Sequence, residues 1–223
     1  RLAETNSEAV SPPSNNDGVS EENAPPLPPK ARGFADNLGV SFHVGSQCMN
    51  PSAYRDAMEL ASQIIREAGV ILDVVDVGGG FPSAYPGMTP PDLELYVKVI
   101  KEVFEQMPVA MNAQLWCEPG RALVAESSSI LVRVELVKDG ALHINDGSYG
   151  NLFDAAHCKW PFPVKAHRPD GEFEGETQGF KLYGPTCDSL DAMEGPFVLP
   201  ADIREGDYIE LGMLGAYGVA MQT

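Results

Sequence analysis

The stretch VILDVVDVGGGFP, residues 70–82, decides the fold of this chain. Its first part, residues 70–77, is rich in branched apolar side chains on both faces, which is typical of a parallel strand covered on both sides. The glycines and the proline that follow are poor strand residues. We therefore predict a buried strand that ends in a glycine-rich loop.

The segments on either side predict the same alternation of strand and helix. LGVSFHV (38–44) is a further buried strand, and Asn-Pro at 50–51 starts a helix that Gly69 ends. Thr-Pro at 89–90 starts a second helix, and AQLWC (113–117) forms a third strand. The order β-α-β-α-β predicts a parallel sheet with right-handed crossovers, as in a barrel or an open α/β sheet. The residues expected to face inward are Tyr54, Ala57, Met58, Ala61, Ile64, Ile65 and Ala68 on the first helix and Leu93, Val97, Ile100 and Phe104 on the second.

The chain changes character at about residue 127. Apolar residues alternate with others over 130–136, and Lys-Asp-Gly at 138–140 has the composition of a hairpin turn. Short strands and Gly/Pro turns continue from there. We predict an α/β part over residues 1–126, followed by a mainly antiparallel β domain over residues 127–223. Within the first part, the proline-rich residues 4–30 are expected to form a surface loop or insertion.

The composition excludes several classes of protein. The formal net charge is −17, with 32 acidic against 15 basic residues and no basic run, so we expect no nucleic-acid partner. No stretch approaches the roughly 18 apolar residues of a membrane span, so we expect no membrane partner. The four cysteines are widely spaced without metal-type pairing, so we expect no metal site and reduced thiols in a cytoplasm.

Residues suited to binding an anion follow the three predicted strands, in FHVGSQ (42–47), DVGGGFP (76–82) and CEPGR (117–121). In a parallel barrel such strand ends carry the chemistry. Consecutive glycines let backbone N–H groups crowd around an anion, and Ser46 and Arg121 add a hydroxyl and a cation. We therefore predict a phosphate site.

His43 and Glu118 stand in the same motifs and extend this prediction. A flat ring and a carboxylate beside a phosphate site suggest a planar, cationic, phosphorylated cofactor. Each motif also has a plainer reading: His43 can be structural, the glycines a simple turn and EPGR a strand-to-helix turn. Three such motifs at successive strand ends favour the cofactor.

Five ordered motifs together resemble a known family: FHVGSQ, DVGGGFP, EPGR, GPTCDSLD (184–191) and GAYG (215–218). They are similar to the barrel-type, alanine-racemase-fold ornithine and lysine decarboxylases, which depend on pyridoxal 5′-phosphate. The resemblance implies that the first part is a portion of a pyridoxal-phosphate-binding TIM-type barrel. It also implies decarboxylation of a basic amino acid in polyamine biosynthesis, with ornithine favoured as substrate and putrescine as product.

The resemblance also implies a role for each site residue. His43 would stack on the pyridine ring, and Glu118 would pair with its nitrogen. The residues implied to bind the cofactor are His43, Ser46, Gly79, Gly80, Glu118, Gly120, Arg121 and Tyr217. Cys187 would protonate the product, reaching in from the partner subunit of a homodimer with shared active sites, with His43 as the other catalytic residue. Phe153, Asp154 and Asp188 would hold the diamino acid. Cys187 can instead be a packed thiol, and Asp154 a helix cap.

One family feature has no counterpart in this chain. The family forms a Schiff base with a lysine on an early barrel strand, whereas all seven lysines here lie outside the strand-end motifs. We expect the chain to be an incomplete, C-terminal portion of a longer enzyme, inactive in isolation. A non-catalytic decoy or binding homologue, a lysine or arginine decarboxylase and a racemase-like activity stay open as alternatives.

Overall fold

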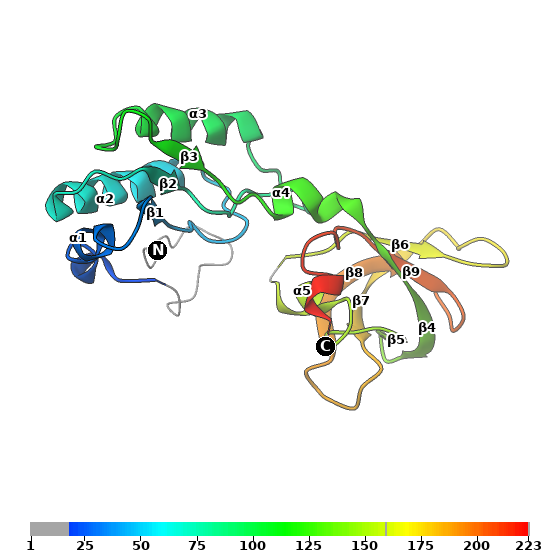
Figure 1. Ribbon diagram of the computed structural model, residues 1–223. Helices are drawn as coiled ribbons and strands as arrows, with labels where there is room; N and C mark the ends of the chain where they lie inside the picture. Colours follow the sequence, from blue (N-terminus) through cyan, green and yellow to red (C-terminus); the bar gives the residue numbers. More distant parts are fainter. Residues whose placement is uncertain (1–17, 159, 223) are drawn as a thin grey trace. The chain divides into compact units, whose positions relative to one another are not determined.

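The computed structural model describes residues 18–158 and 160–222, and the chain divides into two compact units (Figure 1). Unit 1 comprises residues 1–83 and 90–122, and unit 2 comprises residues 84–89 and 123–223. Each unit has its own hydrophobic core. Within the described ranges, no helix is long and apolar enough to cross a membrane.

Unit 1 is built on a parallel sheet, as its sequence predicts. The strands β1 (Gly39–Ser41), β2 (Val74–Asp76) and β3 (Gln114–Trp116) lie side by side in that order. Val75, the middle residue of β2, pairs with Val40 on one side and Leu115 on the other. The β-α-β-α-β order and the parallel pairing are thereby confirmed.

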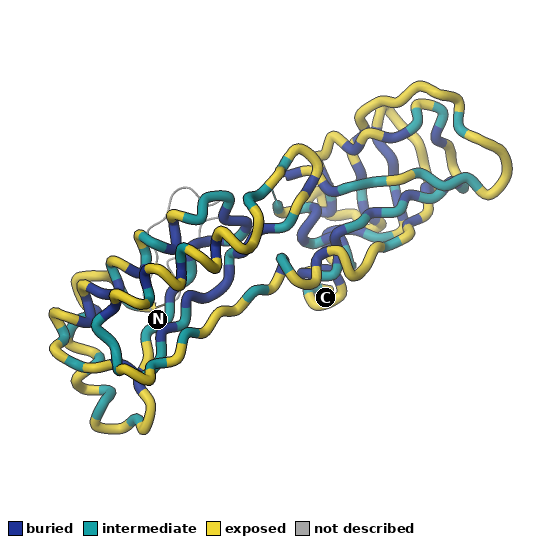
Figure 2. The backbone as a smooth tube through the Cα atoms, turned by 90° about the horizontal axis from the view of Figure 1, so that it is seen from above, coloured by how far each residue is buried: buried dark blue, intermediate teal, exposed yellow. Residues whose placement is uncertain are grey.

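The helix α2 (Ser52–Ala68) confirms the predicted start, end and inward face. Oδ1 of Asn50 accepts the N–H of Ser52 at 3.0 Å, which supplies an early helix donor with a partner. Gly69 follows the last turn with φ of 65°, a left-handed conformation that suits glycine. The predicted inward residues that are buried are Tyr54, Met58, Ala61, Ile64 and Ile65. Figure 2 shows how buried residues, in dark blue, alternate with exposed ones, in yellow, along the chain.

The helix α3 (Leu93–Phe104) corrects two predictions. It begins at Leu93, three residues after the expected Thr-Pro start, and Leu93 and Val97 are exposed rather than inward. The side chains that it buries are Tyr96, Ile100 and Val103. The apolar residues of this helix surround its axis, so the pattern alone did not decide which face is buried. The close packing of the Tyr96 ring against aromatic rings of the core selects this face.

Part of the proline-rich segment is helical, which corrects the expectation of a loop over 4–30. The helix α1 (Leu27–Arg32) follows the 3-10 turn η1 (Glu21–Asn23). Its prolines stand in the first turn, where a missing N–H breaks no helical hydrogen bond. Arg32 pairs with Asp73 at 2.8 Å and ties this helix to the start of β2. Residues 4–17 of the segment lie outside the described residues.

Unit 2 is a six-stranded, mainly antiparallel sheet, as predicted. Its strands in chain order are β4 (Ile130–Lys138), β5 (Ala141–Ile144), β6 (Val164–His167), β7 (Thr177–Tyr183), β8 (Ala192–Pro200) and β9 (Tyr208–Leu211). The sheet order is β6-β9-β4-β5-β7-β8, and β5–β7 is the parallel pair. The predicted hairpin turn is confirmed, since Asp139 and Gly140 both have positive φ, as a two-residue type I′ turn requires.

Short helices complete the described chain. These are α4 (Arg121–Val124), η2 (Ala125–Ser127), α5 (Phe153–His157) and η3 (Val219–Met221). The loop 84–89 packs with unit 2, because the Tyr85 ring contacts the rings of Trp160 and Phe162 at centroid distances of 5.7 and 5.2 Å.

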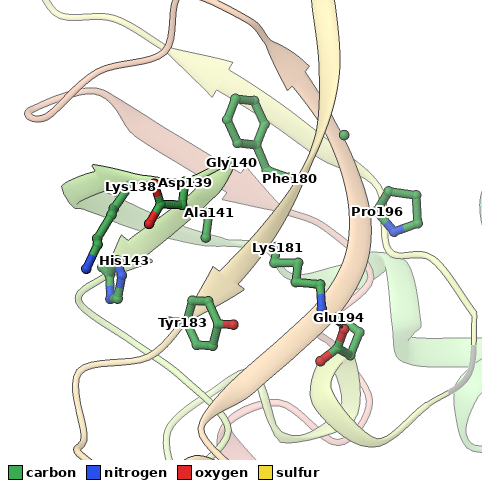
Figure 3. Close-up of a pocket in the computed structure, with 11 residues that line it drawn as sticks. Lys138, Asp139, Gly140, Ala141, His143, Phe180, Lys181, Tyr183, Glu194 and Pro196 are labelled. Atoms are coloured by element: carbon green, nitrogen blue, oxygen red, sulfur yellow. Dashed lines mark ion pairs between the residues drawn. The ribbon is translucent and has the colours of Figure 1, made fainter.

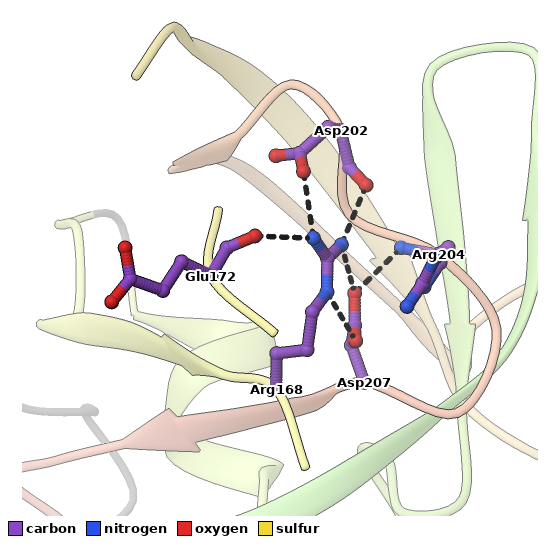
Figure 4. Close-up of polar contacts among 5 residues, drawn as sticks. All are labelled: Arg168, Glu172, Asp202, Arg204 and Asp207. Atoms are coloured by element: carbon purple, nitrogen blue, oxygen red, sulfur yellow. Dashed lines mark hydrogen bonds and ion pairs between the residues drawn. The ribbon is translucent and has the colours of Figure 1, made fainter. Parts of the chain in front are cut away.

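Arg168 organises the loops at one end of unit 2 (Figure 4). Its guanidinium donates to Asp207 at 3.0 and 2.8 Å and to Asp202 at 2.7 Å, and it also bonds the backbone carbonyls of Glu172 and Asp202. Hydrogen bonds to Asp207 and Asp202 raise the pKa of Arg168 above its usual range. These charge-assisted hydrogen bonds fix the Arg168 side chain and the loops that it joins.

Candidate functional site

The three strand ends of unit 1 meet at one edge of the sheet. Beyond the ladders, the N–H of Phe42 bonds the carbonyl of Asp76 at 3.2 Å, and the N–H of Val77 bonds that of Trp116 at 3.0 Å. The N–H of Glu118 bonds the carbonyl of Gly78 at 2.8 Å. The FHVGSQ, DVGGGFP and CEPGR motifs are therefore neighbours in space, as parallel pairing requires.

The glycine loop is where these segments approach most closely. Gly78 has φ of 66°, and a Cβ there would lie 2.1 Å from the carbonyl oxygen of Phe42. Gly80 has φ of 99°, and a Cβ there would lie 2.4 Å from the carbonyl oxygen of Gly45. Only glycine fits both the conformation and the space at these positions.

Two backbone N–H groups of this loop are orphans. Among residues 18–158 and 160–222, the N–H groups of Gly79 and Gly80 have no hydrogen-bond partner. Gly79 is buried. Gly80 is half-buried. Because buried backbone donors almost always have partners, the Gly79 N–H indicates a place for an external acceptor, and the Gly80 N–H is a second donor beside it.

His43 and Glu118 both lie beside Gly79. A Cβ on Gly79 would be 3.4 Å from Cε1 of His43 and 2.9 Å from the carbonyl oxygen of Glu118. His43 is half-buried and the Glu118 side chain is exposed. The imidazole ring thus lies beside Gly79, next to the segment that carries the carboxylate.

Arg121 is connected to the Ser46 loop through a residue that sequence reasoning missed. The hydroxyl of Ser83 donates to the carbonyl of Arg121 at 2.8 Å, and the N–H of Ser83 donates to Oε1 of Gln47 at 3.1 Å. Gln47 in turn donates to the carbonyl of Ser83. Arg121 is 7% exposed, an unusual burial for a cation. Gln47 and Ser83 stand inside or just after quoted motifs, but nothing in their type marked them.

Tyr217 belongs to unit 2, whereas the other predicted cofactor residues belong to unit 1. It is 46% exposed and has φ of 56°. The part of Tyr217 in the cofactor site stays a prediction. Gly120, in unit 1, is exposed, and a Cβ there would have no neighbour within 4 Å.

The loop with Cys187 and Asp188 is held in shape by Asp191. The carboxylate of Asp191 is 2% exposed and accepts both the N–H and the hydroxyl of Ser148 and of Thr186. Burial alone would raise the pKa of Asp191, but the hydrogen bonds from Thr186 and Ser148 outweigh it, so the pKa is lowered. A buried, ionised carboxylate therefore joins the loop after β5 to the loop after β7.

Asp188 is an ionised carboxylate on the surface of that loop. Its Oδ1 accepts the N–H of Leu190 at 3.0 Å, and its Oδ2 accepts the hydroxyl of Tyr149 at 2.6 Å. The bonds from Leu190 and Tyr149 lower the pKa of Asp188. Cys187, next to it, is exposed, so it is not packed in the core of unit 2 as the alternative reading supposed.

Phe153 and Asp154 stand at the start of α5. The ring of Phe153 stacks on that of His157 at a centroid distance of 4.2 Å. Asp154 is 6% exposed and accepts a hydrogen bond from Sγ of Cys158 at 3.0 Å. Because α5 begins at Phe153, Asp154 lies in the first turn and is not the helix cap that the alternative reading supposed.

The described lysines do not lie at the strand ends of unit 1. Lys30 is on α1, Lys98 and Lys101 on α3, Lys138 and Lys165 on β4 and β6, and Lys181 on β7. Lys159 lies outside the described residues.

A cavity elsewhere in unit 2 contains none of the predicted site residues. It has a volume of about 500 Å³ and lies on the face of β5, β7 and β8, as Figure 3 shows. Lys181 forms an ion pair with Glu194 there, and the His143 ring stacks on that of Tyr183 at 5.3 Å. Because this cavity lies apart from the sequence motifs and two of its charged groups already pair with each other, the strand-end site is the better candidate.

Comparison with known proteins identifies similar chains. Residues 29–125 match a family described as pyridoxal-dependent decarboxylase, pyridoxal binding domain. An ornithine decarboxylase of Caenorhabditis elegans is 31% identical over 210 residues, which cover 83% of this chain and 47% of that protein. An antizyme inhibitor 2 of Xenopus laevis is 31% identical over 220 residues, covering 84% and 45%.

Solved structures agree with these relatives. The crystal structure of the Paramecium bursaria Chlorella virus arginine decarboxylase bound to agmatine superposes with a TM-score of 0.80 and 26% identity. The match covers 100% of this chain and 61% of that one. The chain thus spans about half the length of the curated relatives that it matches. The predicted combination of a partial barrel and a β domain is confirmed.

Proposed function

We propose, since the chain belongs to the family of pyridoxal-dependent decarboxylases, that it forms most of the active site of an enzyme that decarboxylates a basic amino acid. Ornithine is the favoured substrate and putrescine the product. This decarboxylation would belong to polyamine biosynthesis in the cytoplasm. The main support is that two glycine N–H groups without a partner among the described residues lie where three strands end, with the ring of His43 beside Gly79.

The residues of this edge fit a phosphate group. The N–H groups of Gly79 and Gly80 supply donors, and the lack of a Cβ lets an oxygen approach them. We assign Ser46, Gly120 and Arg121 to the same phosphate, with Tyr217 contributed by unit 2. Arg121 supplies the charge, since a guanidinium pairs with phosphate oxygens through two parallel hydrogen bonds.

His43 and Glu118 would serve the ring of the cofactor. Pyridoxal phosphate, when bound, supplies an electron sink for the electrons that remain as carbon dioxide leaves. His43 would hold the ring by stacking on its face. Glu118 would keep the ring nitrogen protonated, because a neighbouring carboxylate favours the charged form of that group.

The loops of unit 2 would serve the substrate and the product. Asp188, already ionised, would bind the distal ammonium of a diamino acid, with Asp154 and Phe153 lining the same end. The negative charge of Asp188 would attract the distal ammonium of ornithine or lysine and would repel a distal carboxylate. Cys187 would deliver a proton to the correct carbon, acting on the site of the partner subunit in a homodimer.

A binding homologue without catalysis is the second candidate. It is favoured by the position of the described lysines, which all lie away from the strand ends, and by a relative named antizyme inhibitor 2. Such a protein would keep the fold while losing the chemistry. Retention of His43, Glu118, Arg121, Cys187 and Asp188 supports the decarboxylase, because binding alone has no need of this set.

The test is release of labelled carbon dioxide from carboxyl-labelled ornithine, lysine and arginine by the native protein with pyridoxal phosphate. We expect turnover with ornithine, and loss of cofactor affinity by about 2–4 kcal/mol in Arg121→Ala, the scale of a buried charge-assisted pairing. Arg55→Ala, at the surface, is the matched control. Cofactor binding that is indifferent to Arg121, together with no turnover, would support the binding homologue.

A further inference from the structure

The hydroxyl of Tyr54 lies directly behind the glycine loop. Tyr54 is on α2 and fully buried, and its hydroxyl donates a 2.9 Å hydrogen bond to the carbonyl of Gly79. Its ring is fixed by stacking on Phe81 at 4.9 Å and by the edge of Tyr96 at 5.9 Å. Burial raises the pKa of Tyr54 far above its usual value, so the hydroxyl keeps its proton and stays a donor.

This bond determines where the next N–H points. The carbonyl of Gly79 and the N–H of Gly80 belong to one trans peptide, in which the two groups point in opposite directions. With the carbonyl drawn toward α2, the N–H is directed away from α2. That N–H is one of the two without a partner among the described residues.

A peptide between two glycines has little conformational preference of its own. Gly80 has φ of 99°, and neither residue has a side chain to restrict rotation. The hydrogen bond from Tyr54 therefore restricts the rotation of this peptide, which the glycines themselves do not restrict. An anion-binding donor must be oriented before the anion arrives.

We propose that Tyr54 is a positioning residue for a phosphate monoester: its hydroxyl holds the Gly79–Gly80 peptide so that the Gly80 N–H faces the anion. This assignment rests on the proposed function, which supplies the phosphate. Tyr54 itself does not touch the ligand. A side chain on the helix α2 would thus orient the backbone N–H of Gly80 at the end of a strand.

The chain offers a matched control in Tyr96. Tyr96 is also fully buried, and its hydroxyl donates a 2.8 Å hydrogen bond to the carbonyl of Cys48. Cys48 lies outside the glycine loop and is joined to it through its own N–H, which donates to the carbonyl of Gly80 at 2.9 Å. Tyr54→Phe and Tyr96→Phe therefore remove the same chemical group from the same aromatic cluster, and only the first removes a hydrogen bond to the Gly79–Gly80 peptide itself.

The test titrates the cofactor-free native protein with pyridoxal phosphate and with pyridoxal, which lacks the phosphate. We expect Tyr54→Phe to reduce the preference for the phosphorylated compound about tenfold, the scale of one hydrogen bond to a charged group. Tyr96→Phe should lower thermal stability to a similar extent and leave that preference unchanged. An unaltered preference in a folded Tyr54→Phe protein would overturn the proposal.

Amide hydrogen exchange provides a second test, which uses the unmodified protein and needs no variant. Pyridoxal phosphate, and not pyridoxal, should slow exchange at Gly80, and unchanged exchange there would contradict the assignment. If the unmodified protein does not distinguish the two compounds at all, the phosphate site of the proposed function is itself wrong. The two failures are thus separable.

Discussion

The hydroxyl of Tyr149 donates a 2.6 Å hydrogen bond to Oδ2 of Asp188, 39 residues further along the chain. It joins the loop after β5 to the loop after β7, beside the buried bonds from Ser148 to Asp191. Asp188 is exposed, yet two hydrogen bonds orient its carboxylate, one from the hydroxyl of Tyr149 and one from the N–H of Leu190. The carboxylate that we assign to the substrate is therefore oriented before any substrate binds.

Tyr149→Phe should raise the pKa of Asp188 toward its ordinary value, because one of the two bonds that lower it is lost. The bond from Leu190 remains, so the rise should be partial. Carboxyl chemical shifts followed by NMR over a pH titration measure this. Tyr183→Phe, whose ring stacks on His143, is the control and should leave Asp188 unchanged. A pKa of Asp188 that does not move would show that Tyr149 follows the carboxylate without influencing it.

Acid should destabilise unit 2 through Asp191. Its pKa is lower in the folded state than its usual value of 3.8, so its contribution to stability is present above that value and is lost as pH falls through the folded pKa. Asp191→Asn should lower the free energy of unfolding by about 2–3 kcal/mol at neutral pH, since buried charge-assisted bonds are lost. The variant should also show a flatter dependence of stability below pH of about 4.

Denaturant unfolding between acid and neutral pH measures both effects. Asp170→Asn, an exposed carboxylate in the loop after β6, is the matched control. Equal acid sensitivity of Asp191→Asn and the unmodified protein would exclude Asp191 as the main acid-labile group.

Gly80→Ala should destabilise unit 1 and abolish the preference for phosphorylated ligands. The new Cβ would lie 2.4 Å from the carbonyl oxygen of Gly45, at φ of 99°. We expect a loss of about 1–3 kcal/mol in unfolding free energy from the strained backbone. Gly33→Ala is the control, since its Cβ would meet one atom at an ordinary 3.6 Å. Comparable stability of the two variants would mean that the loop can relax around an added methyl group.

Mixing variants tests the shared site of the proposed homodimer. Cys187→Ala and Glu118→Ala proteins should each be inactive, and their mixture should regain activity if Cys187 completes the partner's site. Random pairing of equal amounts leaves one intact site in half of the dimers, so about a quarter of the unmodified activity should return. Native mass spectrometry verifies the exchange of subunits. Exchange without recovery would place Cys187 in its own subunit's site or outside catalysis.

The 223-residue chain by itself should form no borohydride-trapped adduct with pyridoxal phosphate at a defined lysine. The reason is that no described lysine lies in the segments directly after β1, β2 or β3, where the glycine loop and His43 lie. Peptide mapping by mass spectrometry checks this. A single stoichiometric adduct, on Lys159 for example, would mean that a substitute lysine reaches the cofactor.

The sequence alone was sufficient wherever the signal is local. Gly69 ends α2 and the Asp139–Gly140 pair turns the β4–β5 hairpin because the required backbone conformations are left-handed and few residues adopt them. The branched residues before Gly78 predicted a strand because such side chains favour the extended backbone of a sheet. Parallel pairing then brought the three strand-end motifs to one edge, so the outline of the site followed from chain order.

Only the tertiary structure decided the partners of the buried polar groups and the buried face of α3. Tyr54 finds its acceptor 25 residues away and Ser148 finds Asp191 43 residues away, and nothing near either residue in the sequence marks the pairing. Tyr96, rather than Val97, turns inward because a large ring fills the space beside Tyr54. Such choices depend on which surfaces are packed together, a property of the whole fold that no local pattern contains.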